Sequence, residues 1–74
     1  MNGRKLPVLS WREDVGALSK AGYSIVRQRG SHMILEGPEG KYTVVPRHNE
    51  IAPSTLLKII AEIGLTKEEF LDLL

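Results

Sequence analysis

The chain has 74 residues and no cysteine, and its formal net charge is +1 at pH 7. A chain this short is expected to form a single domain over residues 1–74 with a modest core, which favours a surface site over an enclosed active site. Without cysteine it can form neither disulfides nor thiolate metal sites, and no apolar run is long enough to span a membrane. Residues 1–7 lack the apolar core of a signal peptide, so we expect a cytoplasmic protein.

The small net charge hides an uneven distribution. Residues 1–48 carry eight Lys or Arg against four Asp or Glu (+4), whereas residues 49–74 carry two against five (−3). A basic surface in the first part would suit a phosphate backbone. Charge asymmetries of this size are also common in proteins that bind no nucleic acid, so the charge distribution alone does not establish nucleic-acid binding.

The first predicted helix covers residues 11–21, after an extended lead-in over residues 1–9. Ser10 and Glu13 form a capping-box pattern at its start, and Gly22 suits a left-handed position at its end. Trp11, Val15 and Leu18 fall on one face of this helix.

Three strands are predicted next, over residues 23–29, 32–36 and 41–46. The turns between them, at residues 30–31 and 37–40, are short and rich in glycine, so the strands should form an antiparallel meander. Pro46 favours an edge position for the third strand. Apolar residues occur on both faces of the second strand, which indicates either a surface that a partner covers or one that helix ends cover.

Two helices complete the predicted fold. One begins near Pro53 and closes at Gly64, and a second capping box, Thr66 with Glu69, starts a short terminal helix. Strands grouped between helices indicate an α+β fold with the helices on one face of a three-stranded antiparallel sheet. The acidic pairs at residues 13–14 and 68–69 are interpreted as first-turn charges that favour the helix dipole.

A histidine beside cations is the main candidate site. His32 follows the Gly30-Ser31 turn, and Arg27 and Arg29 precede it. Histidine is the side chain best suited to proton transfer near neutral pH, and arginines can hold phosphates. A lone strand histidine is more often structural than catalytic, and cations on an exposed strand often only keep an edge soluble.

Several segments, taken in order and spacing, resemble the HicA (YcfA-like) family of toxin–antitoxin mRNA interferases over about residues 5–74. The segments that carry the resemblance are Lys5-Leu6-Pro7, Ser10, Lys20-Ala21-Gly22-Tyr23, Val26-Arg27-Gln28-Arg29-Gly30-Ser31-His32, Val45-Pro46 with His48, Ser54-Thr55-Leu56, Ile59-Ile60 and Gly64-Leu65-Thr66. The resemblance implies an α-β-β-β-α fold like that of double-stranded-RNA-binding domains. It also implies cleavage of mRNA, inhibition by a HicB-like antitoxin protein, and His32 as the catalytic residue.

Two positions depart from the family pattern. The second helix of the family usually opens Gly-Thr-Leu followed by a basic residue, whereas this chain has Leu57 there; the missing cation would weaken RNA contact or move it elsewhere. Trp11 stands where a smaller residue is expected, and its commonest use is in the core.

RNA cleavage needs no metal or other cofactor, because the 2′-hydroxyl of RNA is the nucleophile. His32 is our candidate general base, although the sequence does not distinguish a base from an acid. The candidate RNA-binding residues are Arg27, Arg29, Ser31, Lys41 and Arg47. His48 is interpreted as a solvated loop residue that could assist, and a metal site built from His32 and His48 is not expected.

Three functions therefore compete. The first is an endoribonuclease toxin centred on His32, acting on mRNA and paired with an antitoxin. The second is a non-catalytic RNA-binding module of the same fold, which would read shape and phosphates. The third is a protein-interaction domain with no affinity for RNA.

Overall fold

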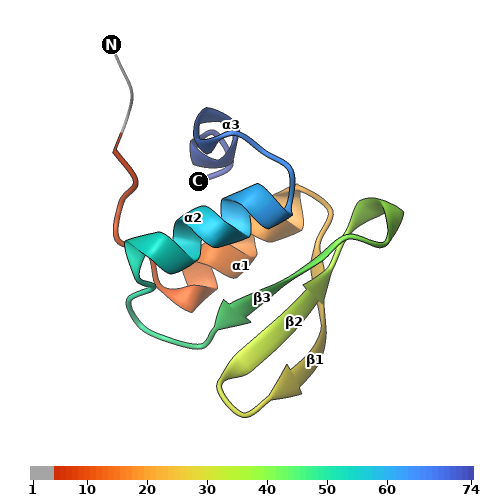
Figure 1. Ribbon diagram of the computed structural model, residues 1–74. Helices are drawn as coiled ribbons and strands as arrows, with labels where there is room; N and C mark the ends of the chain where they lie inside the picture. The colour runs from red at the N-terminus through yellow and green to blue at the C-terminus, as the bar shows by residue number, and fades with distance from the viewer. Residues whose placement is uncertain (1–4) are drawn as a thin grey trace.

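The computed structural model describes residues 5–74 and has the α+β order predicted from the sequence (Figure 1). Residues 1–4 of the predicted extended lead-in lie outside the described part. The elements in chain order are α1 (Trp11–Lys20), β1 (Ser24–Arg29), β2 (His32–Glu36), the 3₁₀ turn η1 (Pro38–Gly40), β3 (Tyr42–Pro46), α2 (Pro53–Glu62) and α3 (Lys67–Leu71). The α-β-β-β-α arrangement and the short terminal helix are thus confirmed.

The three strands form an antiparallel sheet in the order β1-β2-β3, so β3 is an edge strand, as Pro46 predicted. His32 pairs with Arg29 on β1 and with Pro46 on β3. The pairing of β1 with β2 shifts between Ile25 and Arg27, which marks a bulge in β1. Bulges increase the local twist of a strand and redirect its side chains.

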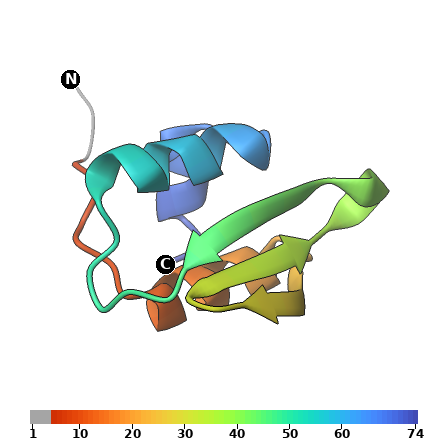
Figure 2. The same ribbon diagram turned by 60° about the horizontal axis from the view of Figure 1, so that its bottom comes forward.

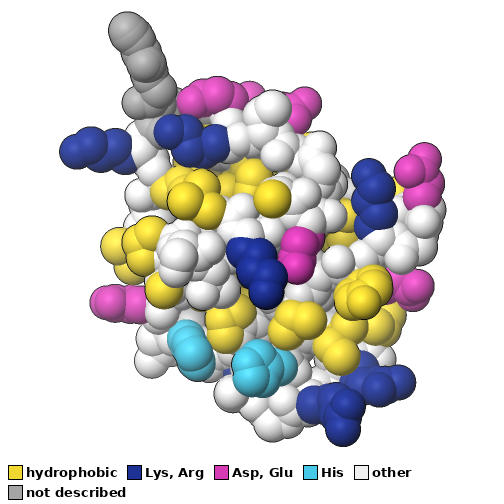
Figure 3. Space-filling model, in the orientation of Figure 1, with side chains coloured by type: hydrophobic (Ala, Val, Ile, Leu, Met, Phe, Trp, Pro, Cys, Tyr) yellow, Lys and Arg dark blue, Asp and Glu magenta, His cyan; other side chains and the backbone are white. Residues whose placement is uncertain are grey.

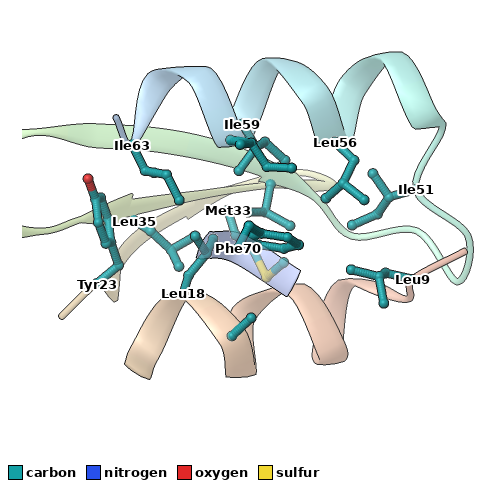
Figure 4. Packing of buried hydrophobic residues seen from close by; sticks show 13 residues of the cluster. Leu9, Leu18, Tyr23, Met33, Leu35, Ile51, Leu56, Ile59, Ile63 and Phe70 are labelled. Atoms are coloured by element: carbon teal, nitrogen blue, oxygen red, sulfur yellow. The ribbon is translucent and has the colours of Figure 1, made fainter. Parts of the chain in front are cut away.

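The inner face of the sheet packs against the helices. Met33, Leu35 and Val45 are at most 2% exposed, and Figure 4 shows Met33 and Leu35 with Phe70 between α2 and α1. Figure 2 shows α2 lying along the β3 side of the sheet. Phe70 of α3 is fully buried, so the terminal helix contributes directly to the core.

The outer face of the sheet remains open. The strand register places eight side chains on it that are exposed or half-buried, and helix ends do not cover them: Ser24, Arg27, Arg29, His32, Ile34, Glu36, Tyr42 and Val44. Tyr42 is 65% exposed and Val44 is 37% exposed. The open face therefore combines cations, one carboxylate, one histidine and apolar side chains.

Both predicted capping boxes form. At α1 the Ser10 amide donates to Glu13 Oε1 (2.9 Å), and the Glu13 amide donates to Ser10 Oγ (3.3 Å). Thr66 and Glu69 repeat the pattern at α3. Gly22, with φ at +91°, provides the left-handed position after α1.

Two side chains of α1 differ from the expectation. Trp11 is only half-buried, and the guanidinium groups of Arg12 and Arg47 lie over its ring, at 4.5 and 5.1 Å from the centroid. Asp14 is in the first turn but is fully buried, and its carboxylate oxygens have no hydrogen-bond partner among residues 5–74. Burial raises the pKa of the Asp14 carboxyl from 3.8 to about 6.

Candidate functional site

His32 is placed by a two-residue turn at the start of β2. Gly30 and Ser31 connect Arg29 to His32, and Gly30 has φ of +58°, a conformation that glycine adopts at little cost. The Gln28 side chain donates to the Gly30 carbonyl oxygen (3.2 Å). The turn therefore projects the exposed His32 side chain onto the outer face at the end of the sheet.

The His32 side chain lines a cleft of about 430 Å³ between the β3 edge and α2. The sheet contributes His32, Val44 and Pro46, the following loop contributes His48, Glu50 and Ala52, and α2 contributes Thr55, Lys58, Ile59 and Glu62. Figure 3 shows both histidines of the chain on the same face of the molecule. Both histidines thus line one solvent-open cleft.

Backbone hydrogen bonds hold the loop that carries His48. The Arg47 amide donates to the Ser31 carbonyl oxygen (2.6 Å), and the His48 amide donates to the Pro46 carbonyl oxygen (2.8 Å). The Trp11 amide, an orphan donor at the start of α1, donates to the His48 carbonyl oxygen (2.9 Å). His48 is exposed, as a solvated residue would be, but its backbone is hydrogen-bonded to Pro46 of β3 and to Trp11 of α1.

A family model described as the HicA toxin of bacterial toxin–antitoxin matches residues 11–65, most of the chain. The chain belongs to the HicA toxin family. The match includes the Gly30-Ser31-His32 turn, the cleft and all of α2, and it ends before α3. A search among curated proteins gave no match.

Membership fixes the general role of this HicA chain. It is a toxin of the toxin–antitoxin type, and such a toxin has an antitoxin partner. Within residues 5–74, no helix is long and apolar enough to cross a membrane, and no three His, Asp or Glu side chains are grouped to hold a metal ion.

The structure brings most of the predicted RNA-binding residues of this HicA to one end of the sheet. Arg27 and Arg29 lie on the same outer face as His32. Ser31 is in the turn itself, and the Arg47 guanidinium lies over the Trp11 ring. Lys41 lies at the opposite end of the sheet. It precedes Pro46, the partner of His32, by five residues, which is about 16 Å along a strand at ~3.3 Å per residue.

Lys58 is the cleft residue that the sequence analysis missed. It is the only cation in α2, and it lines the cleft together with both histidines, whereas the neighbouring Leu57 is 51% exposed and does not line it. Lys58 directly follows position 57, where the sequence analysis noted a missing cation. The sequence shows Lys58 as the only cation of this helix, but its place in the cleft depends on how α2 packs against the sheet.

Glu62 is the only acidic residue of α2, and it contacts the sheet. Its Oε1 accepts a hydrogen bond of 2.7 Å from the hydroxyl of the buried Thr43 on β3. This bond ties the last turn of α2 to the edge strand. It therefore fixes the wall of the cleft opposite the histidines.

Proposed function

We propose that this HicA toxin is an endoribonuclease, an mRNA interferase that cleaves RNA by metal-independent acid–base catalysis at His32. The observation that carries the proposal is the position of His32, exposed on the open sheet face at the rim of a cleft, with Arg27 and Arg29 on the same face. A histidine that only stabilised the fold would not need this combination of exposure and neighbouring cations.

The proposed reaction uses the nucleophile that RNA carries. His32 removes the proton from the 2′-hydroxyl, and the 2′-oxygen attacks the adjacent phosphorus. The bond from phosphorus to the 5′-oxygen breaks, and that oxygen takes up a proton from a general acid or from water, which leaves a 2′,3′-cyclic phosphate and a 5′-hydroxyl. Proton transfer of this kind contributes about 10²–10⁴-fold to the rate.

The cations supply the remaining part of the proposed mechanism. Arg27 and Arg29 bind the phosphate backbone beside the cut linkage, and Arg47 extends this surface past the turn. Ser31 donates its hydroxyl to a phosphate oxygen or orients the imidazole. Lys41 binds RNA only if the strand continues along the sheet to its far end.

The family role adds a partner and a compartment to the proposal. A HicB-like antitoxin would inhibit the toxin most simply by covering His32 and the neighbouring cations. Because the proposed substrate is mRNA, we expect the protein to act in the cytoplasm.

The test is cleavage of a long unstructured RNA by purified protein in EDTA, compared with His32→Ala. The wild type should cleave, and the variant should lose cleavage while it keeps its far-UV circular dichroism and most of its affinity for RNA. RNA binding without cleavage by the wild type would instead support the non-catalytic binding module. No affinity for RNA would support the protein-interaction domain.

A further inference from the structure

We propose that His48 is a second catalytic residue, the general acid that protonates the leaving 5′-oxygen, with Lys58 holding the phosphate between the two histidines. This inference rests on the proposed ribonuclease function and gives it a two-histidine site. It starts from the cleft, which His32, His48 and Lys58 line together.

Proton transfer in this reaction requires two groups in opposite protonation states. The 2′-oxygen must lose a proton while the 5′-oxygen gains one, on opposite sides of the phosphorus. A single imidazole that has just accepted a proton lies on the side of the attacking oxygen. A second imidazole in the same cleft supplies the other proton without a rearrangement of the RNA.

The proposed step is balanced in atoms and charge. Neutral His32 takes the 2′-hydroxyl proton and becomes imidazolium, and the new bond from the 2′-oxygen to phosphorus forms. The bond to the 5′-oxygen breaks, and that oxygen receives the proton of His48, which becomes neutral. Solvent then returns both histidines to their starting states.

The backbone of His48 meets the requirement for a positioned group. Three hydrogen bonds fix the turn: Arg47 to Ser31, His48 to Pro46, and Trp11 to His48, with donor–acceptor distances of 2.6, 2.8 and 2.9 Å. Pro46 itself pairs directly with His32. The backbone positions of the two histidines are therefore set relative to each other by the sheet and not by a free loop.

Besides the two histidines, the charged residues that line the cleft are Glu50, Lys58 and Glu62. Lys58 is the only Lys or Arg among the residues that line the cleft. Its ammonium group suits the charge that develops on the phosphate oxygens.

The experiment uses an RNA in which sulfur replaces the 5′-oxygen leaving group at a linkage that the wild type cleaves. A thiolate leaves without protonation, so a missing general acid has no effect on this substrate. Rates on the ordinary and the sulfur-substituted RNA are measured for the wild type, His48→Ala and His32→Ala. Asn49→Ala is the matched control, because Asn49 is the exposed next residue of the same loop and does not line the cleft.

We expect His48→Ala to lose about 10²–10⁴-fold on ordinary RNA and to recover nearly the wild-type rate on the sulfur-substituted RNA. His32→Ala should be slow on both substrates, and Asn49→Ala should match the wild type on both. A wild-type rate for His48→Ala on ordinary RNA overturns the inference and leaves the proposed function intact, and so does an equal loss on both substrates. A wild type that cleaves neither substrate overturns the proposed function itself.

Discussion

The buried carboxyl of Asp14 gives the sharpest prediction about stability. The Asp14 side chain is fully buried and has no hydrogen-bond partner among residues 5–74. Burial in low dielectric disfavours the ionised form, which is why its pKa rises from 3.8 to about 6. The ionised group therefore works against folding at neutral pH.

The magnitude follows from proton linkage. Between pH 3.8 and about 6 the folded state binds more protons at Asp14 than the unfolded state does, so the free energy of unfolding falls as the pH rises. At 1.36 kcal/mol per pKa unit, the loss is about 3 kcal/mol and is complete above about pH 7. For a domain whose total stability is commonly 5–15 kcal/mol, this is a large fraction.

The perturbation is Asp14→Asn, which keeps the volume and removes the charge. Because the amide also lacks a partner and buried unpaired polar groups cost about 1–3 kcal/mol, the variant should be close to the wild type near pH 4. By pH 7 it should be more stable than the wild type by up to about 3 kcal/mol. The predicted quantity is the difference in the free energy of unfolding between Asp14→Asn and the wild type, as a function of pH.

The assay is urea denaturation followed by far-UV circular dichroism at several pH values from 4 to 8. Glu36→Gln is the control, because the exposed Glu36 side chain should change the stability by no more than about 0.5 kcal/mol. The reasoning is refuted if Asp14→Asn is less stable than the wild type at pH 7, or if the stability difference between them does not change with pH. Either result would mean that the folded protein stabilises the ionised carboxylate.

Three further predictions concern the RNA surface, the pH profile and the terminal helix. The double variant Arg27→Ala with Arg29→Ala should bind RNA more weakly, and the slope of log K against log salt concentration should fall by about 1.4, at ~0.7 per lost phosphate contact. The control Lys20→Ala removes an exposed cation on α1 and should change neither quantity. An unchanged slope in the double variant would mean that RNA binds elsewhere on the protein. A plot of kcat/KM against pH should be bell-shaped for the wild type and should lose its alkaline limb in His48→Ala. The other charged residues that line the cleft are Glu50, Lys58 and Glu62. An unaltered profile in His48→Ala would contradict the role of His48 as general acid. Phe70→Ala should lower the free energy of unfolding, measured by urea denaturation, by about 3–5 kcal/mol, because the ring is fully buried. The control Leu74→Ala changes a half-exposed side chain and should lower it little. A small loss of stability in Phe70→Ala would show that α3 is dispensable for folding.

Local signals in the sequence were sufficient for the elements. The capping boxes at Ser10 and Thr66 and the left-handed glycine at Gly22 act over a few residues, so they could be read without the fold. The order of strands followed from the short turns between them. Element boundaries differ from the prediction by a residue or so, as at β1, which begins at Ser24.

Features that depend on distant residues were not predictable in the same way. Asp14 has the sequence position of a first-turn acid, and its full burial comes from the tertiary packing of α1. The shared cleft of His32 and His48 depends on the pairing of β2 with β3, and Lys58 reaches it only because α2 lies along the β3 edge. These contacts join residues far apart in the sequence, where periodicity carries no information.

The turn at the end of β3 connects the fold to the proposed chemistry. Pro46 has no amide hydrogen and cannot donate to the strand ladder. The next amide, that of Arg47, donates to the Ser31 carbonyl oxygen, and the His48 amide donates to the Pro46 carbonyl oxygen. The same turn accepts the orphan Trp11 amide of α1, so the ends of two strands and the start of one helix meet beside both histidines. Because every one of these bonds uses backbone atoms, removing the His48 imidazole should leave the turn in place. A loss of rate in His48→Ala with unchanged stability would therefore report on proton transfer and not on folding.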